Sequence, residues 1–116
     1  MRYPLLALLL LSLSLPLWAS ERADIAWQWI SQGALIVDVR TPEEFAEGHL
    51  PGAVNLPHGE IERRAGELGV GPEQTIVVYC RSGRRSGLAI GEFAAAGYLE
   101  VHNGGGLEEM REAHTP

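Results

Sequence analysis

Short apolar runs and segments of helical periodicity alternate along the chain. Each apolar run is four to six residues long and ends near turn-forming residues, which is typical of strands that are buried on both faces. The runs lie at 34–39, 53–56, 75–79 and 98–102. The helical segments lie at 24–33, 42–47, 59–68, 87–96 and 107–111. Because strands alternate with helices, we predict a single α/β domain with a parallel central sheet and helices on both faces.

Capping signals indicate where two of these helices begin. Asp24 is expected to cap the first helix. One face of that helix carries its apolar side chains, Ile25, Ala26, Trp29 and Ile30. In the second helix, Thr41, Pro42 at the first helical position and Glu44 together predict a capping box. That helix is expected to end at Gly48.

The first 19 residues have the order of a secretory signal peptide. Arg2 precedes an apolar run over 5–17, and the small residues Ala19 and Ser20 follow it. We predict a signal peptide over 1–19, with cleavage after Ala19. An uncleaved membrane anchor is the alternative, but the run is shorter than the ~20 residues that span a bilayer. The protein is therefore expected to be exported, without stable membrane insertion after cleavage, and the bacterial periplasm fits this pattern.

Composition narrows the class of protein further. With 116 residues, 46% of them apolar, the chain has room for one domain. Its formal net charge is -6 and it contains no lysine, which makes nucleic acid or an anionic membrane surface an unsuitable partner. Four histidines and one cysteine show no metal-ligand spacing, so no metal is expected. The single cysteine, Cys80, cannot form an internal disulfide and is therefore a candidate reactive thiol.

Cys80 stands between a predicted strand and a predicted helix. The loop that follows it consists of Arg81, Ser82, Gly83, Arg84, Arg85 and Ser86. At this place the thiol would face backbone N–H groups that have no partner inside the helix, and the helix dipole also favours negative charge. Three arginines in the loop add positive potential. The pattern predicts a thiolate near neutral pH, that is, a nucleophile in an anion-binding loop.

Three stretches of the chain resemble the motifs of the rhodanese (thiosulfate sulfurtransferase) family. The first is the loop 80–86, the second runs over 37–45 and 48–57, and the third is the Gly-Gly-Leu sequence at 105–107. They occur in the order that the family has. The likeness covers roughly residues 24–112, which we expect to form a rhodanese domain of the short, exported, single-domain form.

The resemblance implies a mechanism and assigns residues to it. Cys80 would attack the outer sulfur of thiosulfate, carry the sulfur as a persulfide and pass it to cyanide or to a thiol, including a protein thiol. No cofactor takes part. The backbone amides of 81–86 would surround the sulfur, Gly83 would allow an unusual backbone angle, and Ser82 and Ser86 would form local hydrogen bonds. The substrate-binding residues would be the loop itself: Arg81, Ser82, Gly83, Arg84, Arg85 and Ser86.

The arginines of the loop are expected to attract the anionic sulfur donor. A guanidinium offers a planar fork of donors that suits such an anion. Arg81 and Arg85 are the first candidates, followed by Arg84. The alternative, that some of these side chains simply point to solvent, stays open.

Three further residues are expected to support the site. Asp38, at the end of a strand, would orient the loop through hydrogen bonds, or alternatively cap the next turn. The family pattern implies that Arg40 pairs with Glu47 and so supports the fold. The family usually carries a tryptophan where Met110 stands, and a thioether can fill the same apolar space.

Three alternative functions are known for proteins that resemble this one. In a cysteine phosphatase or arsenate reductase, an arginine follows the cysteine after five residues, but Ser86 occupies that position here. The loop of this chain is therefore better suited to a sulfur atom than to a tetrahedral oxyanion. A non-catalytic binding module of this fold typically lacks the cysteine. A persulfide carrier or thiol sensor without fast turnover would use the same residues, so this alternative stays open.

Overall fold

The strands form one parallel sheet in the order β2-β1-β3-β4. A computed structural model describes residues 20–114, and the predicted signal peptide over 1–19 lies outside the described residues. The strands are β1 (Leu35–Asp38), β2 (Val54–Asn55), β3 (Ile76–Cys80) and β4 (Val101–Gly106). Parallel strands end at the same edge of the sheet, so the residues that follow them share one region of the molecule.

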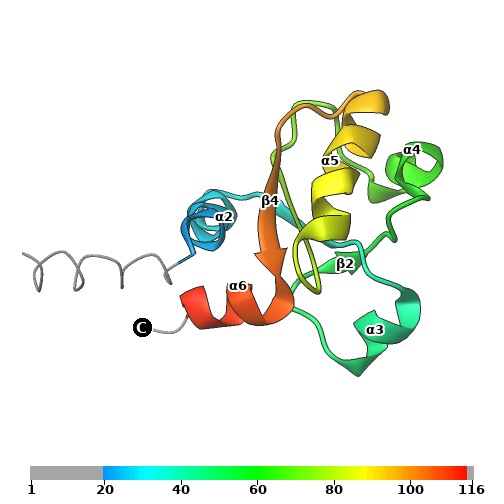
Figure 1. Ribbon diagram of the computed structural model, residues 1–116. Helices are drawn as coiled ribbons and strands as arrows, with labels where there is room; N and C mark the ends of the chain where they lie inside the picture. Colours follow the sequence, from blue (N-terminus) through cyan, green and yellow to red (C-terminus); the bar gives the residue numbers. More distant parts are fainter. Residues whose placement is uncertain (1–19, 115–116) are drawn as a thin grey trace, which may run out of the picture.

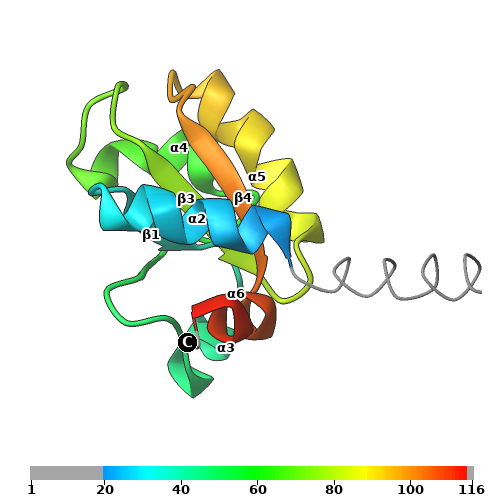
Figure 2. The same ribbon diagram turned by 90° about the vertical axis from the view of Figure 1, so that its left-hand side faces the viewer.

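Helices cover both faces of the sheet, as Figures 1 and 2 show. On one face lie α2 (Glu21–Ser31) and α6 (Leu107–His114), and on the other lie α4 (Ile61–Arg64), a 3₁₀ helix (Ala65–Leu68) and α5 (Arg84–Ala95). The short helix α3 (Pro42–Glu47) lies beyond the carboxyl ends of the strands. The predicted fold class, a single α/β domain with a parallel sheet and helices on both faces, is confirmed.

Two apolar cores result, one on each face of the sheet. Along β3, Ile76, Val78 and Cys80 belong to the core under α4 and α5. Val77 and Tyr79 belong to the core under α2 and α6. All five residues are buried. Because successive side chains of a strand point to opposite faces, a strand covered on both sides must be apolar throughout, as this run is.

The first helix differs from the sequence prediction at its start. Its cap is Ser20, whose hydroxyl accepts a hydrogen bond from the backbone N–H of Ala23, and not Asp24. The small residues Ala23 and Ala26 are buried, whereas Ile25 is exposed. The reason is close packing: α2 approaches the sheet so nearly that a Cβ on Gly104 would lie 3.1 Å from the Cβ of Ala26. Side chains larger than alanine would not fit there.

Strand β4 lies further along the chain than predicted. It spans Val101–Gly106 rather than 98–102, and it includes three glycines that the sequence favoured as a loop. A Cβ on Gly104 would lie 2.6 Å from the sulfur of Met110 and 3.3 Å from Cγ1 of Val77. Glycine is therefore used here for close approach, which outweighs its low strand propensity. Met110 itself is fully buried.

The remaining helices agree with the prediction fully or to within a few residues. The capping box of Thr41 and Glu44 is present, and α3 spans Pro42–Glu47 as predicted. The helix expected over 59–68 consists of α4 and a 3₁₀ helix. The last helix continues to His114, whose ring stacks on the indole of Trp27 with centroids 4.0 Å apart. The indole N–H of Trp27 also donates to the carbonyl of Met110 at 2.8 Å.

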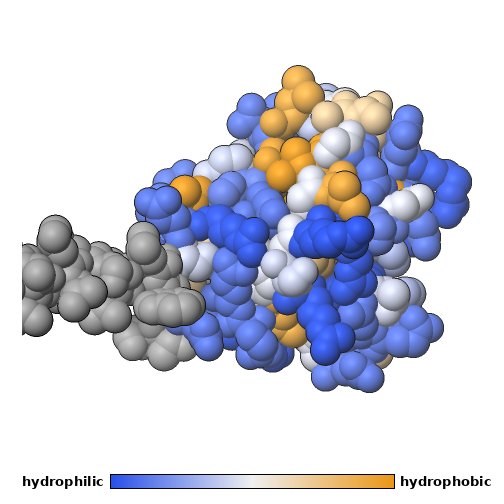
Figure 3. Space-filling view, viewed as in Figure 1, coloured by the Kyte–Doolittle hydropathy of each residue, from blue (hydrophilic) through white to orange (hydrophobic). Residues whose placement is uncertain are grey.

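The surface shown in Figure 3 is mainly hydrophilic, with an apolar patch where α5 leads into β4. Leu99 in this connection and Leu88 on α5 are the most exposed of the large apolar side chains among residues 20–114. Within that same part of the chain, no helix has the length and apolar character needed to cross a membrane.

Candidate active site

Cys80 is the last residue of β3, at the edge where the parallel strands end. Only residues 81–83 separate it from α5, which begins at Arg84 and not at Gly87 as predicted. The helix begins early because Gly83 adopts the left-handed conformation, with φ of 97°, and turns the chain directly from strand into helix. The first turn of α5 therefore has its free N–H groups close to the thiol.

The sulfur of Cys80 accepts hydrogen bonds inside this loop. The backbone N–H of Gly83 donates to Sγ at 3.0 Å, and the hydroxyl of Ser86 lies 3.5 Å from Sγ. Burial raises the pKa of the Cys80 thiol, but hydrogen bonds from Ser86 and from the backbone N–H groups of Ser82 and Gly83 lower it by more. The net result is a pKa below the ordinary value of a cysteine, as the sequence pattern predicts.

The hydroxyl of Ser86 has a second and closer partner. It donates to Oδ1 of Asn103 at 2.7 Å, and its single proton cannot serve that oxygen and the sulfur at once. Asn103 also donates to the carbonyl of Gly83 at 3.0 Å and accepts from the N–H of Gly105 at 2.9 Å. Asn103 thus ties β4 to the loop, and the N–H of Gly83 makes the shorter of the two hydrogen bonds to the sulfur, 3.0 Å against 3.5 Å.

Sequence reasoning missed Asn103. The predicted strand ends at His102, one residue before Asn103, and no role was assigned to the asparagine. Its one signal was a polar side chain directly before a run of glycines.

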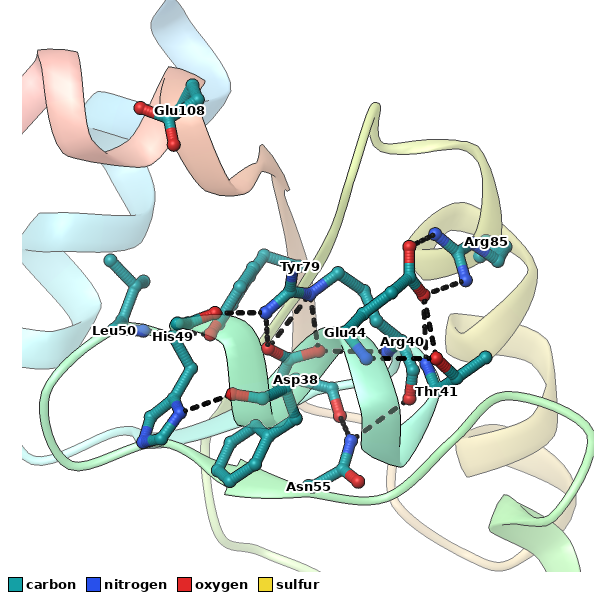
Figure 4. Close-up of polar contacts among 12 residues, drawn as sticks. Asp38, Arg40, Thr41, Glu44, His49, Leu50, Asn55, Tyr79, Arg85 and Glu108 are labelled. Carbon is teal, nitrogen blue, oxygen red and sulfur yellow. Dashed lines mark hydrogen bonds and ion pairs between the residues drawn. The ribbon is translucent and has the colours of Figure 1, made fainter.

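The three arginines of the loop region have different surroundings. Arg85 forms a bidentate ion pair with Glu44 of α3, at 2.8 and 3.0 Å (Figure 4). This hydrogen bonding is the main cause that lowers the pKa of Glu44 to about 2. Arg81 and Arg84 are exposed, and within residues 20–114 neither has an ion-pair partner. Sequence reasoning used Glu44 only as a capping residue and missed its pairing with the loop.

The expected pair between Arg40 and Glu47 is wrong. Arg40 is buried with Asp38, and its Nε and Nη2 donate to the carboxylate at 3.0 and 2.7 Å (Figure 4). Asp38 is the nearer partner because it stands two residues earlier, where side chains of an extended chain point the same way. Glu47 is exposed at the end of α3. Arg40 also donates to the carbonyl of Gly48 at 2.6 Å, so the pair fixes the turn after α3.

Asp38 supports the connections that follow β1 and α3, and not the Cys80 loop. Its Oδ1 accepts from the backbone N–H of Arg40 at 2.9 Å, which corresponds to the alternative interpretation that it caps the turn after its strand. Nearby, the hydroxyl of Tyr79 accepts from the N–H of Leu50 at 3.0 Å, and Asn55 donates to the carbonyl of Arg40 (Figure 4). These contacts position the connections that lie beside the site.

The model of the rhodanese-like domain family matches residues 22–113. The chain belongs to this family. It is 38% identical over 106 residues to the thiosulfate sulfurtransferase PspE of Escherichia coli, an alignment that covers 91% of this chain and 88% of the relative. A putative sulfur carrier protein of Bacillus subtilis, YrkF, is 44% identical over 68 residues, which cover 59% of this chain and 36% of YrkF.

A solved structure supports the same assignment. The structure of a rhodanese from Escherichia coli, solved with anions, superposes on this chain with a TM-score of 0.62 at 36% identity. The superposition covers 66% of this chain and 91% of the Escherichia coli chain. The resemblance drawn from the three motifs is therefore confirmed. The named relatives support the enzyme class predicted for this rhodanese, a sulfurtransferase.

Proposed function

We propose that this rhodanese is an exported enzyme that takes the outer sulfur of thiosulfate onto Cys80 and passes it to a thiol or to cyanide. The observation that carries the proposal is the short hydrogen bond from the Gly83 N–H to the sulfur of Cys80, within a loop that also bears exposed arginines. A sulfur held in this way is stabilised as an anion, both as thiolate and as persulfide.

The first step forms one sulfur–sulfur bond and breaks another. The Cys80 thiolate attacks the outer sulfur of thiosulfate, the bond to the inner sulfur breaks, and sulfite leaves with the electron pair. Cys80 is left as a persulfide anion, so no external oxidant or reductant is needed. In the second step an acceptor thiolate or cyanide attacks the outer sulfur of the persulfide and releases the Cys80 thiolate.

Charged side chains around the loop divide the tasks of attraction and support. Arg81 and Arg84 are exposed and have no ion-pair partner in the described part of the chain, so they are suited to attract the dianionic donor. Arg85 is held by Glu44 and supports the loop. This assignment leaves the cysteine phosphatase alternative without its arginine clamp, because Ser86 is buried beside the sulfur where that arginine would stand.

A persulfide carrier is the second candidate. The name of the related YrkF, putative sulfur carrier protein, favours it. The two functions differ in turnover: an enzyme releases the sulfur repeatedly to a small acceptor, whereas a carrier retains it until a specific protein partner arrives.

Export depends on the signal peptide predicted over 1–19. Cleavage after Ala19 would leave Ser20, the cap of α2, as the first residue of the mature protein. The domain would then begin directly at its first helix.

The decisive measurement is the intact mass of the mature protein before and after thiosulfate, with Cys80→Ser as control. We expect a gain of about 32 Da, one sulfur, that requires Cys80 and that cyanide removes, as covalent catalysis demands. Multiple turnovers of thiocyanate formation would support the enzyme, and a single stoichiometric transfer would support the carrier. If a protein with a free thiol gained no mass, the thiosulfate assignment would be wrong.

A further inference from the structure

Arg22, near the start of α2, reaches the loop that carries Cys80. Its Nη2 donates to the carbonyl oxygen of Ser82 at 3.0 Å. The guanidinium lies directly over the next residue, because a Cβ on Gly83 would lie within 2.5 to 2.8 Å of three of its atoms. Arg22 lies outside the three motifs that identify the family in this sequence.

Glu109 of α6 holds Arg22 in this place. Its carboxylate accepts from Nε and from Nη2 of Arg22, both at 2.8 Å, in a bidentate pair. Glu109 also accepts from the hydroxyl of Ser20 at 2.6 Å and from the N–H of Gly106 at 3.0 Å. The carboxylate is thus fixed by the helix cap and by the end of β4, and it aims the arginine at the loop.

The carbonyl that Arg22 binds and the N–H that Cys80 binds belong to one peptide unit. The Ser82–Gly83 bond joins the carbonyl of Ser82 to the nitrogen of Gly83, and residues 20–114 contain no cis peptide bond. In a planar trans peptide the C=O and the N–H point in opposite directions. A donor on the oxygen side therefore fixes the direction of the N–H, which donates to Sγ of Cys80 at 3.0 Å.

We propose that Arg22, held by Glu109, is a positioning residue that orients and polarises the Ser82–Gly83 peptide toward the sulfur of Cys80. A charged donor on a carbonyl strengthens the hydrogen bond that the same amide makes through its N–H. The effect would lower the pKa of the thiol and stabilise the anionic persulfide. The persulfide part rests on the proposed function, whereas the effect on the thiol does not.

The charged groups around Cys80 allow orientation to be separated from simple charge. Arg22 of α2 and Arg85 of α5 both interact electrostatically with Cys80, and each is paired with a carboxylate, Arg22 with Glu109 and Arg85 with Glu44. If only net charge mattered, removing the negative charge of Glu109 would lower the pKa of Cys80. If orientation matters, the same change frees Arg22 and raises the pKa of Cys80. The two explanations predict opposite signs for one variant.

The test is a titration of the Cys80 thiolate by its ultraviolet absorbance, which is clean because the chain has one cysteine. A Cys80→Ser protein supplies the baseline for the tyrosines. The variants are Arg22→Met, Arg22→Lys and Glu109→Gln, with Arg63→Met, an exposed arginine of α4, as the matched control. Thermal unfolding of each variant is recorded beside the titration.

We expect Arg22→Met to raise the midpoint of the thiolate titration by about one pH unit, the scale of one hydrogen bond to a charged group. Glu109→Gln should also raise it, by less, and Arg22→Lys should restore it only in part. Arg63→Met should leave it unchanged.

Two results would overturn the proposal. One is a midpoint in Arg22→Lys equal to that of the unmodified protein together with a lowered midpoint in Glu109→Gln, since charge alone would then explain the effect. The other is a midpoint in Arg22→Met equal to that of Arg63→Met. If Arg22→Met does not fold, the sign of the shift in Glu109→Gln decides. Because no sulfur donor is used, failure here is distinct from failure of the sulfurtransferase assignment.

Discussion

Arg81 and Arg85 lie four residues apart, yet their side chains have different surroundings. Arg85 is half-buried against Glu44, and its fork of donors is occupied by that carboxylate. Arg81 is exposed at the start of the loop. A side chain already paired in a bidentate way has little to offer a substrate anion, so the two arginines should fail differently when they are replaced.

We expect Arg81→Ala to raise the half-saturating thiosulfate concentration roughly two- to threefold, the scale of one exposed charge interaction, with little change in stability. Arg85→Ala should instead lower the free energy of unfolding. Steady-state kinetics and urea denaturation distinguish the two effects, with Arg63→Ala as the control. Equal kinetic losses in Arg81→Ala and in this control would contradict the assignment.

Helix α3 shows how a local signal supports a distant contact. Thr41 and Glu44 form its capping box, and the same Glu44 carboxylate holds Arg85 of α5. The helix has six residues and buries no side chain completely, so it depends on its cap more than a longer helix would.

Removing the cap tests this dependence. Thr41→Ala should lower the free energy of unfolding by about 1 kcal/mol, because the N–H of Glu44 loses the acceptor at the helix start. Thr41→Ser keeps the hydroxyl and should cost much less. Urea denaturation measures both. Equal stability of the two variants would show that the box contributes nothing beyond packing of the methyl group.

At the scale of the whole molecule, two carboxylates link separate segments. Glu44 joins α3 to α5, and Glu109 joins α6 to α2. Hydrogen bonds from their arginine partners are the main cause that lowers the pKa of each to about 2 from an ordinary 4.5. The two ion pairs therefore connect helices around the Cys80 loop, α3 with α5 and α6 with α2, which the sheet alone does not connect.

The lowered pKa values predict acid sensitivity. Between about pH 4.5 and 2 the unfolded chain binds more protons at these two groups than the folded protein does. Their contribution to stability is therefore complete above about pH 4.5 and is lost as the pH falls through about 2. Urea denaturation from pH 6 to 2 checks this: the double variant Glu44→Gln with Glu109→Gln should be less stable at pH 6 and should lose less stability on acidification. If the free energy of unfolding of the double variant fell with pH as steeply as that of the unmodified protein, the prediction would be contradicted.

The order of elements and the place of Cys80 could be predicted from the sequence alone. Short apolar runs between helical segments indicate a parallel sheet, because strands buried on both faces must be apolar throughout. The capping box of α3 and the position of Cys80 between strand and helix are local patterns of a few residues, and both predictions agree with the structure. The family resemblance also came from contiguous motifs.

The tertiary structure decided which side chains meet. The family resemblance implied a pair between Arg40 and Glu47, but in the structure Arg40 is buried in an ion pair with Asp38. The glycines predicted to form a loop belong to strand β4. Helices α6 and α2 pack so closely on this strand that Gly104 has no room for a side chain. Arg22 and Glu109 are 87 residues apart, and only the stacking of α2 on α6 brings them together. Contacts over such separations depend on how elements pack, which no local run of residues encodes.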